Sequence, residues 1–87
     1  MEIKIEPHTL ERAEERGASI AEIEDVLTNG VSVPAKGGRQ MKTRVYLFQQ
    51  ERLGKYYEQK RIEVIYVVEA NQLVTVTVYV FYGEWKD

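Results

Sequence analysis

The stretch that decides the fold is Leu73–Tyr82, whose sequence is LVTVTVYVFY. Valine occupies every second position and alternates with threonine or an aromatic residue, which is the period of two of a β-strand with two different faces. The preceding stretch Arg61–Glu69, RIEVIYVVE, alternates in a similar way. Ala70–Gln72 separates the two stretches, so the pattern predicts two antiparallel strands joined by a short turn.

The alternation also predicts how these two strands pair. Their more apolar faces coincide only if the numbers of paired residues add to an even value, as they do for Val64 with Val78. An even register needs an odd number of turn residues, so we expect Glu69 to pair with Leu73 across a three-residue turn. The two faces that must coincide are formed by Ile62, Val64, Tyr66 and Val68 and by Val74, Val76, Val78 and Val80.

A further extended segment, Thr43–Gln49, precedes this pair, and the three successive segments predict an antiparallel meander. Val31–Pro34 suits a sheet edge, where proline is tolerated. Glu2–Glu6 gives either a short first strand or an extended lead-in. One sheet face is rich in valine and isoleucine and needs a cover of helices. We expect the other face to be more polar and open to water or to a partner, because it carries Thr75, Thr77, Tyr79 and charged residues.

Two helices supply that cover. Pro7 suits the first position of a helix because its missing N–H would be unpaired there, and Gly17 suits a left-handed helix end. Ser19 and Glu22 form a capping box, which starts a second helix that ends at Asn29–Gly30. We therefore expect residues 1–87 to form a single α+β domain, with two N-terminal helices packed on one face of a curved antiparallel β-sheet.

The composition excludes several kinds of protein. With no cysteine and one histidine, the chain has neither a disulfide framework nor the usual ligands of a zinc site, and we expect no metal or cofactor. No apolar run approaches the roughly 20 residues of a membrane span, and the N-terminal residues do not join a basic region to an apolar one. We therefore expect a cytoplasmic protein that does not contact the membrane.

The net charge of -2 hides an uneven distribution of charges. Residues 31–61 carry eight lysines and arginines against two glutamates, whereas the segments before and after them are acidic. A basic region of this kind is what phosphate binding requires. The glycines between Lys36 and Arg39 leave two alternatives open, a phosphate contact or a simple turn. The cations of this region that we select for RNA contacts are Lys36, Arg39 and Arg44, and Lys42 is selected as a candidate for catalysis.

The first predicted helix carries the only histidine of the chain. His8, Arg12 and Arg16 follow one another at intervals of four residues, so they line one stripe of the helix within roughly 80°. Such a stripe is either a solvated face or a site for an anion. In the first case His8 serves as a structural cap, and the arginines pair with neighbouring acids such as Glu11 or Glu15.

The chemistry that remains needs neither a metal nor a cofactor. No nucleophile-elbow pattern indicates a hydrolase triad, and no glycine pattern indicates a nucleotide-binding loop. RNA cleavage through attack by its own 2′-OH needs only a group that moves protons and cations that hold the phosphate. His8 can move protons because histidine changes its charge near neutral pH, while Arg12, Arg16 and Lys42 can hold the phosphate. The candidates for stacking on a base or acting as a weak acid are Tyr79 and Tyr82.

The pattern His8-x-x-x-Arg12-x-x-x-Arg16-Gly17, followed by Ile20, Ile23 and Val26-Leu27, resembles the start of a prokaryotic domain of unknown function, family 4258. The family's ending is similar to Ile62–Tyr66, Thr75–Tyr79 and Tyr82–Trp85. Such domains resemble the RelE and BrnT toxins, small ribonucleases of the BECR fold with helices on one side of an antiparallel sheet. The resemblance implies a RelE-like fold and a metal-independent RNA endonuclease of toxin–antitoxin type, with an antitoxin protein as partner. It also implies that His8 and Arg12 are the first candidates for catalysis, with Lys42 next.

A second hypothesis is a non-catalytic module that binds a protein partner, or forms a homodimer, through a strand edge or its tyrosine-bearing surface. The spatial arrangement of the site residues distinguishes the two hypotheses. A nuclease requires His8, Arg12 and a cation of residues 31–61 to converge on one concave surface. The binding module is favoured if no cleavage appears and if Tyr79, Phe81 and Trp85 lie in a dimer interface rather than beside His8.

Overall fold

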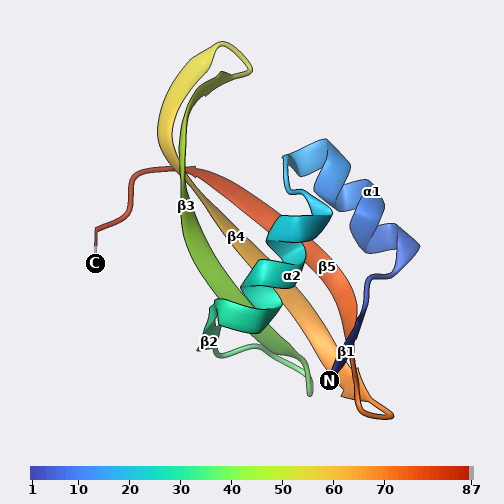
Figure 1. Ribbon diagram of the computed structural model, residues 1–87. Coiled ribbons are helices and arrows are strands. Elements are labelled where there is room, and N and C mark those ends of the chain that lie inside the picture. The colour runs from blue at the N-terminus through green and yellow to red at the C-terminus, as the bar shows by residue number, and fades with distance from the viewer. Residues whose placement is uncertain (87) are drawn as a thin grey trace.

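The structure is a computed structural model that describes residues 1–86. Five strands form one curved sheet in the order β1-β5-β4-β3-β2, and both helices lie on the same face of it (Figure 1). The predicted α+β class and the placement of the helices are confirmed. The elements are β1 (Glu2–Lys4), α1 (Pro7–Arg16), α2 (Ile20–Asn29), β2 (Val31–Val33), β3 (Gln40–Arg52), β4 (Lys55–Glu69) and β5 (Gln72–Gly83).

Helix α1 begins at Pro7 and ends before Gly17, as predicted. Gly17 has φ = 94°, and its N–H donates to the carbonyl of Ala13 at 2.8 Å. A Cβ at this position would also overlap the hydroxyl of Tyr82. Glycine is therefore required twice at this position, by the left-handed conformation and by the close approach of β5.

Helix α2 begins with the predicted capping box. The N–H of Glu22 donates to the Ser19 hydroxyl at 3.1 Å, and the N–H of Ser19 donates to the Glu22 carboxylate at 2.9 Å. The helix ends at Asn29, followed by Gly30. Among the residues that the structure describes, no helix is long and apolar enough to cross a membrane.

Strands β3 to β5 form the predicted antiparallel meander, and β2 pairs with β3 at the sheet edge, as expected for Val31–Pro34. The expectation of an entirely antiparallel sheet is wrong, because β1 pairs in parallel with β5, Glu2 lying opposite Gln72 and Lys4 opposite Val74. A parallel pair requires a long connection between its strands. Both helices and the whole meander supply that connection here, so no local pattern around Glu2–Lys4 could have revealed the pairing.

Strands β3 and β4 are longer than predicted and form a two-stranded arm that extends beyond the helices (Figure 1). The sequence predicts a strand over Thr43–Gln49, whereas β3 continues to Arg52. Gln49, Gln50 and Glu51 are all polar and exposed, so the alternation that reveals a half-buried strand is missing there. Leu53 and Gly54, with φ values of 53° and 82°, form the turn at its tip.

The register between β4 and β5 is correctly predicted in one half and wrong in the other. Val64 pairs with Val78 as expected, but Glu69 pairs with Gln72 across a two-residue turn. Both turn residues, Ala70 and Asn71, have positive φ values, which are typical of a two-residue hairpin turn. An irregularity between Ile65 and Tyr66 leaves Val76 without an opposite residue and shifts the register by one. The bulge thus reconciles the tight turn with the even register beyond it.

The bulge changes the face on which Thr75 lies. The prediction placed Thr75 on the open face, but its side chain is buried against α1, where its hydroxyl donates to that of Thr9 at 2.8 Å. Val74, on the other side of the bulge, moves to the opposite face. The core between helices and sheet consists of Ala13, Ala18, Ile23, Val26, Leu27, Ile62, Val64, Tyr66 and Val78.

The open face of the sheet, which the helices do not cover, is more apolar than predicted. Four consecutive rows of paired residues cross it. They are Val33–Met41–Ile65–Thr77, Val31–Thr43–Glu63–Tyr79, Val45–Arg61–Phe81 and Leu47–Gln59–Gly83. The charged residues of the face are therefore concentrated in β4, while the strands on both sides of it are mostly apolar.

Candidate functional site

Arg16, the last residue of the stripe on α1, contacts the free edge of β5. Beyond Val74, no strand of residues 1–86 pairs with the outer edge of β5, and the side chain of Arg16 occupies part of this edge. Its Nη1 donates to the carbonyl oxygen of Val78 at 2.6 Å, and its Cζ lies 4.9 Å from the ring centroid of Tyr79. The hydroxyl of Tyr82 in turn donates to the carbonyl oxygen of Arg16 at 2.6 Å. Three residues selected from the sequence, Arg16, Tyr79 and Tyr82, thus lie together.

Arg52 joins this cluster from the arm. Its Nη2 donates to the carbonyl oxygen of Glu15 at 2.8 Å, and its Cζ lies 4.9 Å from the ring centroid of Tyr82. Arg52 is not among the site residues that the sequence analysis selects. The only signal was its membership in the basic residues 31–61. We call Arg16, Arg52, Tyr79 and Tyr82 the arginine–tyrosine cluster.

Within residues 1–86, no carboxylate neutralises the positive charges of the two arginines of this cluster, so these charges can attract an anion. Both donate to backbone carbonyls, and within residues 1–86 neither forms an ion pair with a carboxylate. They lie at the C-terminal end of α1, where the helix dipole favours cations. Burial raises the pKa of Tyr82, although the charge of Arg52 opposes this effect. Tyr82 therefore remains a neutral hydrogen-bond donor at neutral pH.

Arg12 and His8 continue the stripe toward the start of α1. The guanidinium of Arg12 contacts both carboxylate oxygens of Glu15, at 2.8 and 3.0 Å, so the pairing that the sequence left open does occur. His8 is exposed, at the second residue of the helix. The N-cap position belongs to Glu6, whose side chain makes no capping bond. The stripe thus ends in an accessible imidazole.

Two other selected cations lie against α2 instead. Lys42 donates from Nζ to the carbonyl of Leu27 at 2.9 Å. Arg44 pairs with Asp25 at 3.0 Å, and the Tyr46 hydroxyl also donates to Asp25 at 2.5 Å. The bond from Tyr46, followed by one from Asn29, lowers the pKa of Asp25. Both cations thus serve contacts between β3 and α2.

The remaining selected cations, Lys36 and Arg39, lie in the exposed loop between β2 and β3. The N–H of Arg39 donates to the carbonyl of Lys36 at 3.3 Å, which is the geometry of a simple turn. These two cations belong to the same end of the sheet as the Ala70–Asn71 turn (Figure 1). The arm and its Arg52 lie at the opposite end.

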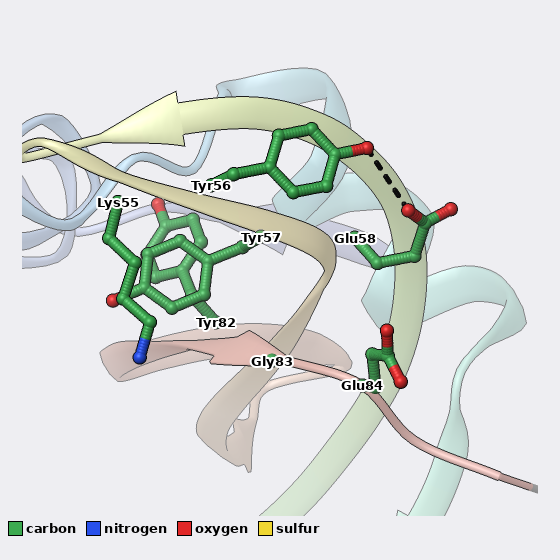
Figure 2. A pocket seen from close by; sticks show the side chains of 7 residues that line it. All are labelled: Lys55, Tyr56, Tyr57, Glu58, Tyr82, Gly83 and Glu84. Carbon is green, nitrogen blue, oxygen red and sulfur yellow. Dashed lines mark hydrogen bonds between the residues drawn. The ribbon is translucent and has the colours of Figure 1, made fainter.

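A shallow hollow of 280 Å³ adjoins the arginine–tyrosine cluster through Tyr82 (Figure 2). The rings of Tyr57 and Tyr82 lie with centroids 5.4 Å apart, and Lys55 extends beside them. Glu58 and Glu84 close the other side of the hollow, and Glu58 accepts a hydrogen bond from Tyr56 at 3.0 Å. Aromatic rings next to cations are the components of a site that stacks a base.

The comparisons with known proteins identify a family and no individual relative. A family model described as a domain of unknown function, DUF4258, matches residues 5–80. No curated protein and no solved structure matches the chain. The matched range includes both helices and most of the sheet, together with His8, Arg12, Arg16, Arg52 and Tyr79. The chain therefore belongs to the DUF4258 family, a domain of unknown function.

Proposed function

We propose that this protein is a metal-independent RNA endonuclease of the toxin–antitoxin type with a RelE-like fold. The observation that carries the proposal is the arginine–tyrosine cluster. It places two cations without carboxylate partners, among the described residues, beside two tyrosines, at the end of a helix stripe that begins with His8. Two helices on one face of a mainly antiparallel sheet are compatible with the RelE-like assignment.

The stripe offers a path for the RNA backbone. His8 and Arg16 are eight residues apart on α1, which corresponds to about 12 Å along the helix axis. Arginine binds phosphate through charge-assisted and bidentate hydrogen bonds. In this arrangement Arg12 exchanges Glu15 for the phosphate next to His8, and Arg16 and Arg52 hold the phosphates that follow. Tyr79 and the hollow beside Tyr82 receive unstacked bases.

The proposed reaction uses the substrate's own nucleophile. His8 removes the proton of the 2′-OH, and the 2′-oxygen forms a bond to the adjacent phosphorus. The bond from phosphorus to the 5′-oxygen breaks, and that oxygen takes up a proton from the solvent. The products are a 2′,3′-cyclic phosphate and a 5′-hydroxyl end. Arg12 stabilises the additional negative charge on the phosphate in the transition state.

Cleavage of single-stranded RNA by the purified chain, in buffer with EDTA, tests the proposal. We expect wild-type protein to cleave and His8→Ala to lose cleavage while its thermal unfolding is unchanged. Glu14→Ala is the matched control, because Glu14 is an exposed residue of the same helix on the flank that lines a hollow with Ser19 and Ile20. The proposal would be rejected if wild-type protein left the RNA intact, or if His8→Ala cleaved RNA as well as wild type does.

The proposal also includes a protein partner. A nuclease of this type requires an antitoxin that binds it and prevents cleavage in the cell. The cluster's cations favour an acidic segment on that partner. Co-expression with the product of a neighbouring gene, followed by co-purification and the same cleavage assay, tests this part independently of the His8 experiment.

A further inference from the structure

We propose that the open face of the sheet is the interface of a homodimer in which two sheets stack face to face. This inference does not depend on the nuclease activity. It starts from the four rows of residues that cross the face, because their composition does not suit contact with water. An antiparallel sheet with one face in solvent normally alternates between apolar residues inside and polar residues outside.

The large side chains that are exposed on this face are apolar, whereas Thr43 is buried there. Leu47 is 70% exposed, Val31 67%, Phe81 46%, and Val45 and Tyr79 38% each. The rings of Tyr79 and Phe81 stack with centroids 6.4 Å apart, so they form one continuous apolar surface on β5. Contiguous exposed apolar surface of this kind marks an interface.

The charged residues of the face indicate which partner covers it. Arg61 Nε lies 3.2 Å from Glu63 Oε2 and donates to the Thr43 hydroxyl at 3.0 Å, and that hydroxyl donates to the carbonyl of Ile62 at 3.1 Å. These groups therefore already have partners within the chain. A second sheet can cover them without leaving a charge unpaired, which would be costly in an interface.

A second copy of this chain fits the face better than an acidic or a basic partner does. The charged pair at its centre is neutral as a whole, so it attracts neither kind of partner selectively. A two-fold axis between Arg61 and Glu63 places Arg61 of each copy opposite Glu63 of the other. The net charge of -2 per chain is small, so repulsion between two copies is weak.

The stacked arrangement leaves the helices on the outside of the dimer. Two sheets pack about 10 Å apart with their strands about 30° from parallel. Both copies of α1 then remain accessible, and Arg16 and Tyr79 lie at the rim of the interface. The dimer thus leaves His8, Arg12 and Arg52 of the proposed RNA site outside the interface, and it would also form in a protein that does not cleave RNA.

The first experiment measures the mass of the full chain by sedimentation equilibrium over a range of concentrations. We expect wild type to approach twice its mass of 10.1 kDa. Phe81→Asp and Leu47→Asp, each on the open face, should raise the dissociation constant of the dimer about tenfold or more. Leu53→Asp is the matched control, because Leu53 is 95% exposed at the tip of the arm, away from this face. Thermal unfolding of each variant confirms that it is folded.

The second experiment tests the two-fold arrangement itself. Arg61→Glu and Glu63→Arg each place like charges on the face, so each variant alone should be monomeric. A mixture of the two variants should form heterodimers, because the face of one is then positive and that of the other negative. A wild type that stays at 10.1 kDa, a dimer that Leu53→Asp weakens as much as Phe81→Asp does, or a mixture that stays monomeric would overturn the proposal. Binding of monomeric wild type to lipid vesicles would overturn it as well.

Discussion

Arg16 donates a hydrogen bond to the carbonyl oxygen of Val78 at 2.6 Å and thereby fixes α1 to the free edge of β5. An uncovered strand edge exposes unpaired backbone groups that can pair with another chain. Here the guanidinium of Arg16 binds one of these groups, the carbonyl oxygen of Val78, at the edge where a further strand would pair. It also lies over the ring of Tyr79, so one side chain connects the helix, the sheet edge and the open face.

The first prediction concerns the stability that this contact supplies. Arg16→Ala should lower the free energy of unfolding by about 1 to 2 kcal/mol, because it removes a charge-assisted hydrogen bond and a partly exposed cation–π contact. Urea denaturation measures the loss. Glu14→Ala, on the opposite flank of the helix, should change stability by less than about 0.5 kcal/mol. Equal stability of the two variants would show that the edge contact is not stabilising.

The second prediction separates the two reasons for glycine at position 17. Gly17→Ala should destabilise the fold by more than about 1 kcal/mol, since it combines a left-handed φ with overlap on the Tyr82 hydroxyl. Gly37→Ala is the control for φ alone, because Gly37 has φ = 67° and no heavy atom lies within 4 Å of the position that a Cβ would occupy there. Chemical denaturation should show a clearly larger loss for Gly17→Ala. Equal losses would contradict the close approach of Tyr82.

The third prediction concerns the buried hydroxyl pair that the bulge creates. Thr75 donates to Thr9 at 2.8 Å and accepts from the N–H of Glu6 at 3.0 Å. Thr75→Val should cost about 1 to 3 kcal/mol, because it leaves the Glu6 N–H without its acceptor. Thr9→Val should cost less, and the double variant should cost less than the sum of the two. Strictly additive losses in a double-mutant cycle would exclude the Thr9–Thr75 bond.

The fourth prediction is a dependence of stability on pH at Asp25. Hydrogen bonds, first from Tyr46, hold the pKa of Asp25 below its ordinary value of 3.8 in the folded chain. A carboxyl with a depressed folded pKa stabilises the fold above its unfolded pKa, and this contribution is lost as the pH falls through the lower, folded value. The stability difference between wild type and Tyr46→Phe should therefore shrink when the pH falls below 3.8. A difference that stays constant from pH 7 to about pH 2 would contradict this role.

The fifth prediction concerns RNA binding by the arginine–tyrosine cluster. The affinity for single-stranded RNA should fall with salt, and Arg52→Ala should reduce the slope of log K against log salt by about 0.7 to 1, as expected for one lost phosphate contact. Lys36→Ala, at the opposite end of the sheet, is the matched cation control. Fluorescence anisotropy at several salt concentrations gives both slopes. A larger change for Lys36→Ala would place the RNA on the loop between β2 and β3 instead.

The parts of the fold that the sequence predicts correctly are those with local causes. The helix ends are determined by residues at or next to them, namely Pro7, Gly17 and the Ser19–Glu22 capping box. The parallel pairing of β1 depends on the whole chain between it and β5, and the bulge at Val76 depends on a conflict between a tight turn and a distant register. Neither leaves a local pattern that can be recognised.

The candidate site follows the same rule. The stripe of His8, Arg12 and Arg16 is a local helical pattern, and the structure retains it. Arg52 reaches the stripe only because the arm is longer than its alternation indicates. The direction of Lys42 toward α2 depends on which face of β3 meets the helices, and that register is set by pairing with β4.

The proposed function depends above all on one step, the attack of the 2′-OH on the phosphate with His8 moving the proton. The most direct measurement is the chemical nature of the RNA ends that purified wild type produces in EDTA, with His8→Ala purified in parallel to exclude contaminating ribonuclease. We expect 2′,3′-cyclic phosphate and 5′-hydroxyl ends with wild type and intact RNA with His8→Ala. Ends that carry a 5′-phosphate, or identical products from both proteins, would contradict this mechanism.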